Sequence, residues 1–233
     1  MKRYLLILFI LIIFIFPAKA QRFNVGLLAG VDISDVGGAD LTDPDNDFNK
    51  FGFTVGGYVN TKINKSTFQM EMAFAQKGSS QPPDSTNNNN FYNLLLDYVD
   101  VTLAYRHSLH LNIGKQPSDK FELECGASVG YLFHYSYTVK QIELPIVLNT
   151  TDVSAFIGFA YNFSPNFAID LRYSNSVIPV IKPDAANPYF LYYNSWNDGH
   201  NLVFQITFKY TFGKFANTSS STPSNSDQSS EPK

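Results

Sequence analysis

The sequence predicts an all-β fold, namely an eight-stranded antiparallel up-and-down transmembrane β-barrel with an N-terminal signal peptide. Three observations predict it: apolar residues recur at every second position, connections alternate between long and short, and aromatic residues lie near segment ends. Phe and Tyr, which favour strands, make up most of the 15% aromatic content. The net charge of −3 does not suggest a nucleic-acid partner, because such binding requires a basic face.

The first twenty residues have the layout of a secretory signal peptide. Lys2 and Arg3 precede an apolar run, and Ala18 and Ala20 form the small-x-small pattern of a cleavage site. The run is shorter than the ~20 apolar residues of a spanning helix, which argues against a membrane anchor. We expect cleavage between Ala20 and Gln21, with secretion through the inner membrane.

Eight later segments alternate between apolar and polar residues. In the last one, Phe204, Ile206 and Phe208 alternate with Gln205 and Thr207. A period of two places each set on its own face of a strand. Each segment has about the 9–11 residues that a tilted strand needs to cross a bilayer. The predicted strands are residues 23–34, 51–61, 67–77, 97–107, 120–133, 152–163, 166–175 and 201–212.

The connections between these segments favour an outer-membrane barrel over a soluble one. Residues 62–66 and 164–165 form short turns, whereas four other connections are long. Outer-membrane barrels have short periplasmic turns and longer outside loops. The connection over residues 108–119 is longer than this pattern predicts. The long connections are residues 35–50, 78–96, 134–151 and 176–200.

The polar face is predicted to line a narrow interior, and the apolar face to contact outer-membrane lipid. Aromatic residues such as Phe68 and Phe74 fall near the two ends of the apolar band, as in a membrane barrel. An eight-stranded barrel has room inside only for its own side chains, so charged groups there must be paired or hydrated. The predicted interior charged network is Glu71, Asp100, Arg106, Glu122, Glu124, Asp170, Arg172 and Lys209.

Several segments resemble those of a known family. They are RFNVGLLAGVDIS, FGFTVGGYV, FQMEMAFAQKGSS, DYVDVTLAYRH, FELECGASVGYLF, VSAFIGFAYNFSPNFAIDLRYS and the closing LVFQITFKYTF. Together they resemble the outer membrane β-barrel domain family typified by PorT-like proteins of Gram-negative bacteria, over about residues 21–215. The resemblance implies an outer-membrane barrel and allows a role in protein secretion. This chain has Val101-Thr102 where the family often has an isoleucine-proline pair.

Two further regions of the sequence bear on function. Residues 216–233 are rich in Ser, Thr and Asn without apolar periodicity, which predicts a disordered tail. Asp43, Asp45 and Asp47 have the 1-3-5 spacing of a calcium loop, but Phe48 stands where that loop needs glycine. They are weak metal candidates in what we expect to be a solvated acidic loop. No cofactor is expected.

Little in the sequence indicates an enzyme. His134 with Ser136, or His200 with Ser195, would have to act at the outer rim, and no spacing places a base, a nucleophile and an orienting acid together. An activity on membrane lipids stays as a minor alternative. We expect a monomeric barrel with a structural or interaction role, as a membrane scaffold or a component that docks envelope proteins through its outside loops. A small pore and a soluble periplasmic lipid-binding barrel with its apolar face inward are the alternatives.

Overall fold

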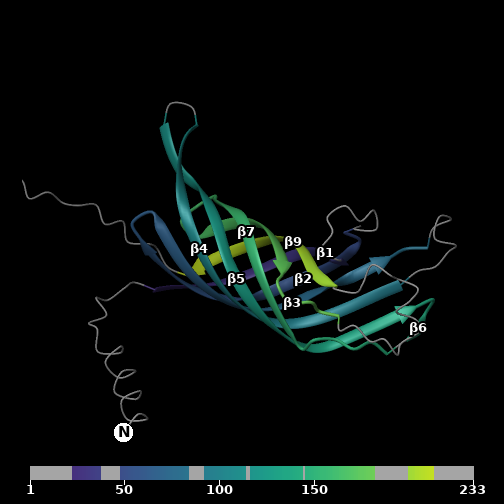
Figure 1. Ribbon diagram of the computed structural model, residues 1–233. Helices are drawn as coiled ribbons and strands as arrows, with labels where there is room; N and C mark the ends of the chain where they lie inside the picture. The colour runs from purple at the N-terminus through teal and green to yellow at the C-terminus, as the bar shows by residue number, and fades with distance from the viewer. Residues whose placement is uncertain are drawn as a thin grey trace, which may run out of the picture.

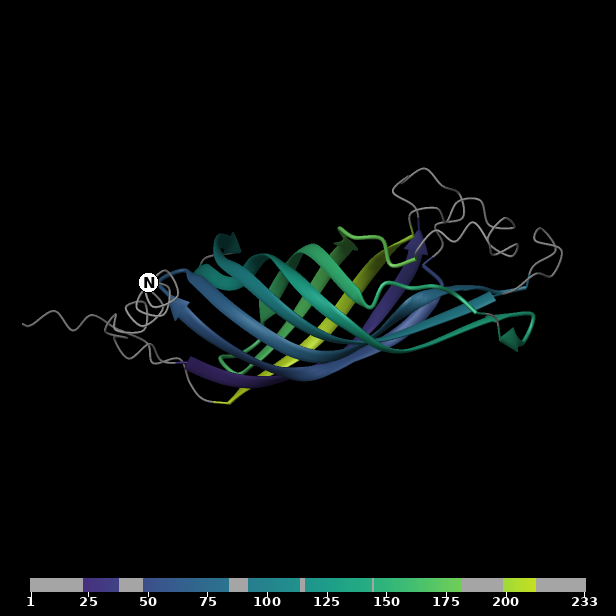
Figure 2. The same ribbon diagram turned by 60° about the horizontal axis from the view of Figure 1, so that its bottom comes forward.

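The computed structural model describes residues 23–37, 48–83, 92–113, 116–143, 145–181 and 199–212. Eight long strands and one short strand form one antiparallel sheet that curves around a common axis (Figures 1 and 2). Among these residues, no helix is long and apolar enough to cross a membrane. The strands are β1 (Phe23–Gly37), β2 (Lys50–Ile63), β3 (Ser66–Gln81), β4 (Tyr92–Ile113), β5 (Gln116–Val139), β6 (Ile142–Glu143), β7 (Thr151–Asn162), β8 (Phe167–Ser176) and β9 (His200–Phe212).

The sheet closes into a ring. Along it the strands follow the order β4-β3-β2-β1-β9-β8-β7-β5, and β4 also pairs with β5. The first and last long strands pair from Val25↔Phe212 to Gly37↔His200, which joins the two ends of the chain's strand series. Each of the eight long strands therefore has two neighbours, and this closure is what allows a sheet to sit in lipid without an unpaired edge.

Short turns gather at one end of the ring, which identifies it as the periplasmic end. Asn64, with a φ of 57°, turns β2 into β3, and the hydroxyl of Ser164 accepts a hydrogen bond from the backbone N–H of Phe167 before β8. The prediction of a long connection over residues 108–119 is wrong. β4 and β5 pair as far as Ile113↔Gln116, through an irregularity between Leu109 and Leu111, and extend beyond their neighbours (Figure 1).

The outward face of the barrel is apolar. Met72 and Leu103, in the middle of β3 and β4, are 63% and 62% exposed, while the alternate residues point inward and are buried. Aromatic rings contact one another across strands near both ends of this apolar band. The ring centroids lie 5.3 Å apart for Phe68–Tyr105 at the periplasmic end, and 5.0 Å apart for Phe53–Phe74 at the outer end. Cys125 also lies on this exposed face.

The stripe of apolar residues on β9 does not reach lipid along its whole length. Phe204, Phe208 and Phe212 are exposed, but Leu202 is buried. Phe48, which precedes β2, packs its ring edge-on against Phe204 at 4.9 Å between centroids. The outer end of β9 is thus partly covered by protein.

An apolar cluster, here called the outer cap, packs at the outer end of the barrel. The strand start predicted at residue 97 is wrong, because β4 begins at Tyr92. The additional strand residues Leu94 and Leu96 are fully buried and form part of this cluster. Two connecting segments lie against each other there, with an isolated bridge between Leu148 and Ile181. The outer cap consists of Val36, Tyr92, Leu94, Leu96, Tyr98, Leu132, Tyr137, Ile146, Leu148, Val180 and Ile181.

We predict that Met72→Arg destabilises the barrel in lipid by about 2–4 kcal/mol, because an arginine would then lie near the middle of the apolar band. Urea unfolding in phospholipid vesicles measures this cost. Ile63→Arg is the matched control, since Ile63 is also exposed but lies beside the periplasmic turn, where the cost should be about 0–1 kcal/mol. Equal costs at the two positions would contradict the placement of the bilayer.

Candidate functional site

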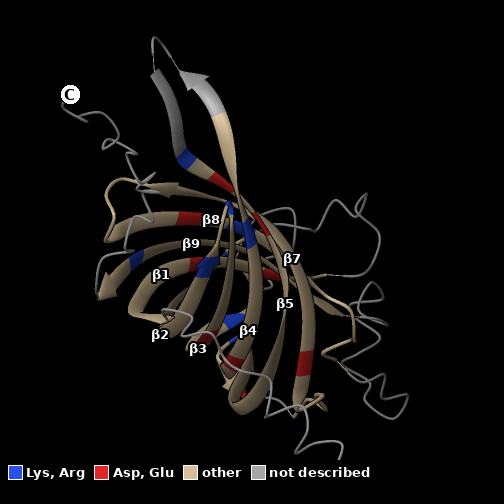
Figure 3. Ribbon diagram, turned by 90° about the vertical axis from the view of Figure 1, so that its left-hand side faces the viewer, with Lys and Arg blue, Asp and Glu red and all other residues tan. Residues whose placement is uncertain are grey.

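The interior of the barrel is lined by charged side chains at the inward positions of successive strands. In β3, β5 and β8 these positions place Glu71, Glu124 and Asp170 toward the axis, all nearly fully buried. Blue and red bands mark the charged residues on neighbouring strands in Figure 3. Such groups stay charged in a low-dielectric interior only when they are paired, so their partners decide what the interior can do.

The residues that meet in the middle of the barrel form one ion-pair cluster, here called the central network. Arg172 donates two hydrogen bonds to Glu71, at 2.7 and 2.6 Å, and one to Glu124 at 2.5 Å. Lys209 also reaches Glu71, at 2.7 Å, and forms an ion pair with Asp170. The two-pronged contact of an arginine with a carboxylate fixes both side chains in place. The central network consists of Glu71, Arg106, Glu122, Glu124, Asp170, Arg172 and Lys209.

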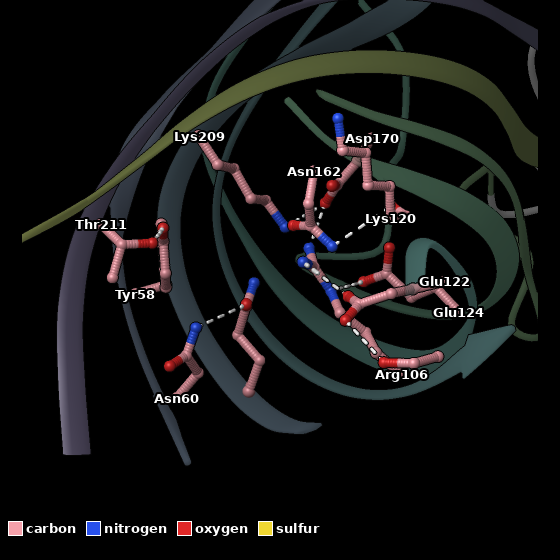
Figure 4. Close-up of polar contacts among 12 residues, drawn as sticks. Tyr58, Asn60, Arg106, Lys120, Glu122, Glu124, Asn162, Asp170, Lys209 and Thr211 are labelled. Carbon is pink, nitrogen blue, oxygen red and sulfur yellow. Dashed lines mark hydrogen bonds and ion pairs between the residues drawn. The ribbon is translucent and has the colours of Figure 1, made fainter. Parts of the chain in front are cut away.

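Arg106 extends the central network toward the periplasm. Its guanidinium pairs with Asp170 and lies 3.5 Å from Glu124 and 3.8 Å from Glu122 (Figure 4). Glu122 also accepts a hydrogen bond from the hydroxyl of Ser108 at 3.2 Å. The cluster joins strands that are far apart along the ring, because Arg106 lies on β4 and Asp170 on β8. It therefore connects strands on different sides of the barrel through the interior.

A smaller group, here called the outer network, lies closer to the outer end. Lys77 pairs with Asp100 at 2.9 Å and with Asp152 at 3.1 Å. Asp152 also accepts hydrogen bonds from Asn201 at 2.9 Å and Ser154 at 3.0 Å. These contacts join β3, β4, β7 and β9. The outer network is Lys77, Asp100 and Asp152.

Asp32 differs from the other buried carboxylates in its neighbours. It is fully buried on β1 and accepts a hydrogen bond from Gln205 at 3.0 Å and another from the hydroxyl of Thr54. Both of these partners are neutral. Asp32 is thus held by hydrogen bonds rather than by a direct ion pair among the described residues.

Two aromatic rings fill space between the charged groups. Tyr98 lies 4.8 Å from the ammonium of Lys77, and Phe156 lies 4.7 Å from the guanidinium of Arg172, both within the range of cation–π attraction. Gly126 makes room for Phe156, because a Cβ at Gly126 would lie 2.6 Å from that ring. These contacts leave a cavity of only about 40 Å³ between the two networks.

All eight charged residues that the sequence places in the interior are buried there in the structure. Seven of them meet in the central network, and Asp100 belongs to the outer network. Asp32, Lys77 and Asp152 were missed, although each has the inward alternation of its own strand. Lys77 and Asp152 stand at the ends of the predicted segments. The candidates Asp43, Asp45 and Asp47, and the cleavage residues Ala20 and Gln21, lie outside the described residues.

The central network also contains an arrangement of carboxylates within reach of a single metal ion. Oxygen atoms of Glu71, Glu124 and Asp170 lie within 4.8 Å of one another. Each of the three carboxylates already contacts Arg172, and Lys209 contacts two of them. The protein's own cations therefore act as the counterions at this place.

The histidines considered for catalysis are held by other groups. His134 Nδ1 lies 2.9 Å from a carboxylate oxygen of Asp97, and His200 Nδ1 lies 2.8 Å from the backbone oxygen of Ser176. No serine hydroxyl bonds to either ring within the part of the chain that the structure describes, and Ser195 falls outside it. Among the described residues, the geometry thus offers no pair of nucleophile and base around these two rings.

A closed antiparallel ring with an apolar outer face and a charged interior defines a membrane β-barrel. The sequence matches the family model for the outer membrane protein beta-barrel domain over residues 18–182. The chain therefore belongs to this family of outer-membrane β-barrel proteins, and the protein is located in the outer membrane. Comparison with curated protein sequences gave no match.

Solved outer-membrane structures are similar to this chain at low sequence identity. Ail, the attachment invasion locus protein of Yersinia pestis, in complex with the heparin analogue sucrose octasulfate, is 15% identical over 82% of this chain and 99% of that chain, with a TM-score of 0.44. Neisserial surface protein A is 11% identical over 82% and 97%, with a TM-score of 0.41. CarO of Acinetobacter baumannii is 11% identical over 79% and 97%, with a TM-score of 0.42.

We predict that Asp170→Asn destabilises the barrel by about 3–5 kcal/mol, because it leaves Arg106 and Lys209 without a carboxylate on which both converge. Asp32→Asn, which is the same chemical change at a site with neutral partners, should cost no more than about 1 kcal/mol. The midpoints of urea unfolding, followed by the gel shift between folded and boiled protein, compare the two. A larger loss for Asp32→Asn than for Asp170→Asn would contradict this account of the interior.

Proposed function

We propose that the protein is a closed outer-membrane barrel with a structural or interaction role, acting as a membrane scaffold or as a docking component for other envelope proteins. The observation that carries the proposal is the filled interior. The central network spans the barrel from β4 to β8, the outer network lies beyond it, and the outer cap packs at the outer end. A barrel whose middle is filled by its own ion pairs is suited to presenting surfaces rather than to passing solutes.

Two alternatives are less well supported by this geometry. A small pore would need a continuous water path, and the cavity between the two networks is only about 40 Å³. A soluble lipid carrier would need an apolar interior. The inward positions instead hold Glu71, Arg172 and the other charged groups, while Met72 and other large apolar side chains face outward. The resemblance to PorT-like proteins allows a docking role within a secretion system, which is one form of the proposed interaction role.

We predict that the purified protein, reconstituted in planar lipid bilayers, gives no steady single-channel current. Arg172 and Lys209 would have to leave five buried carboxylate contacts before ions could pass through the centre. The insertion of folded barrels is checked in the same samples by the gel shift on boiling. Uniform, long-lived current steps from folded protein would favour the pore and overturn the scaffold proposal.

A further inference from the structure

The hairpin of β4 and β5 continues beyond the ring at the periplasmic end (Figure 1). The ladder between β3 and β4 ends at His107, and the ladder between β7 and β5 ends at Phe121. Past these points β4 and β5 still pair with each other, as far as Ile113↔Gln116. Among the described residues, each of the two strands has one neighbouring strand along this projection. The hairpin therefore presents two outer edges, and such edges are templates on which a further strand can pair.

The edge on β5 is protected against such pairing. Close to the ring, β5 has two residues, Asp119 and Lys120, where β4 has only one, which is a β-bulge. The amide of Asn162 donates a hydrogen bond to the backbone oxygen of Lys120 at 3.4 Å. Further out stands Pro117, which has no backbone N–H to donate. Bulges, charged residues and proline are the features by which natural sheets protect an edge.

The edge on β4 is built differently. Its residues from Leu109 to Ile113, here called the β4 edge, include no proline, lysine or acidic residue. The backbone N–H of Ser108 donates to the backbone oxygen of Lys65 at 2.9 Å, so this N–H points to the side of β3. Alternate residues of a strand direct their N–H groups to the same side, so Asn112 directs its N–H to the outer edge. Asn112 stands opposite Pro117, so β4 offers a donor at the level where β5 has none.

An exposed lysine stands where a strand on the β4 edge would end. An incoming strand antiparallel to β4 runs toward the membrane, so its carboxyl end meets the turn between β2 and β3, which carries Lys65. No carboxylate pairs with the ammonium group of Lys65 within the described ranges. This charge favours an acidic end on the incoming strand. A second copy of the chain fits less well, because two copies in one membrane point the same way and their β4 strands would run parallel.

We propose that the β4 edge pairs with an extended segment of a periplasmic polypeptide that has an acidic carboxyl end. Backbone hydrogen bonds supply the affinity in strand addition of this kind, and Lys65 would supply the charge contact that sets the direction. The proposal rests on the interaction role proposed above and gives that role a site on the periplasmic side. The partner segment would add a strand to the hairpin without opening the wall of the barrel.

Fluorescence anisotropy tests the proposal, with the folded full-length protein in phospholipid nanodiscs and a labelled peptide, Thr-Val-Thr-Val-Thr-Val-Glu-Glu with a free carboxyl end. We expect saturable binding with a Kd of about 100 μM or tighter. Asn112→Pro should weaken binding roughly ten-fold or more, because it removes a backbone donor and places a ring in the path of the added strand.

The charge contact is tested in the same assay. Lys65→Gln should weaken binding about two- to five-fold, which is the usual size of an exposed ion pair. Lys120→Gln is the matched control, since Lys120 is also exposed at this end of the barrel but lies on β5, and it should bind as the wild type does. A peptide that ends in Lys-Lys-amide should bind more weakly than the acidic one.

Each outcome has a definite meaning. Absence of saturable binding, equal binding by Asn112→Pro, or equal binding of the Lys-Lys peptide would overturn the proposal. Cross-linked wild-type dimers that Asn112→Pro abolishes would assign the edge to a second copy instead, and binding that appears only after removal of residues 216–233 would assign it to the chain's own tail. If Asn112→Pro loses its gel shift on boiling, the comparison of Lys65→Gln with Lys120→Gln decides. A bilayer without channel current together with absence of binding would overturn this inference and leave the scaffold role standing.

Discussion

The hydrocarbon core of a bilayer contains no partner for a backbone N–H or C=O group, and the architecture of this protein depends on that constraint. The pairing of β1 with β9 is the consequence, because it completes a ring in which each long strand has two neighbours. Closure then fixes two surfaces with opposite requirements. The outward positions, such as Met72 and Phe208, meet lipid, and the inward positions meet one another.

Ring size sets the chemistry of the inward surface. Eight strands enclose a space that side chains can fill, so charged groups from opposite walls come within direct contact. Asp170 on β8 thus meets Arg106 from β4 and Lys209 from β9, and Arg172 reaches Glu71 on β3. The same contacts that neutralise these charges also fill the middle of the barrel. The contacts that stabilise the barrel are thus the same ones that fill its middle.

The sequence was sufficient for the features that depend on alternation. The period of two around Ile206 and in seven other segments predicted the strands, and it placed Glu71 and Asp170 inside. Features that depend on contacts beyond one strand were missed. Lys77 stands at a predicted strand end, and only its pairing with Asp152, from a strand far along the chain, shows that it belongs to the interior. The inward position of the Phe156 ring depends in the same way on another strand, because Gly126 on β5 makes room for it inside.

The most direct test of the account is a nitroxide scan of β9 in vesicles, in a Cys125→Ser background. Single labels at Phe204, Gln205, Thr207 and Phe208 would be exposed to oxygen, which concentrates in lipid, and to a water-soluble nickel chelate. The account predicts high oxygen accessibility at Phe204 and Phe208, and low accessibility to both reagents at Gln205 and Thr207. Strong nickel accessibility at Gln205 and Thr207 would contradict it, because water would then fill the interior that we describe as closed.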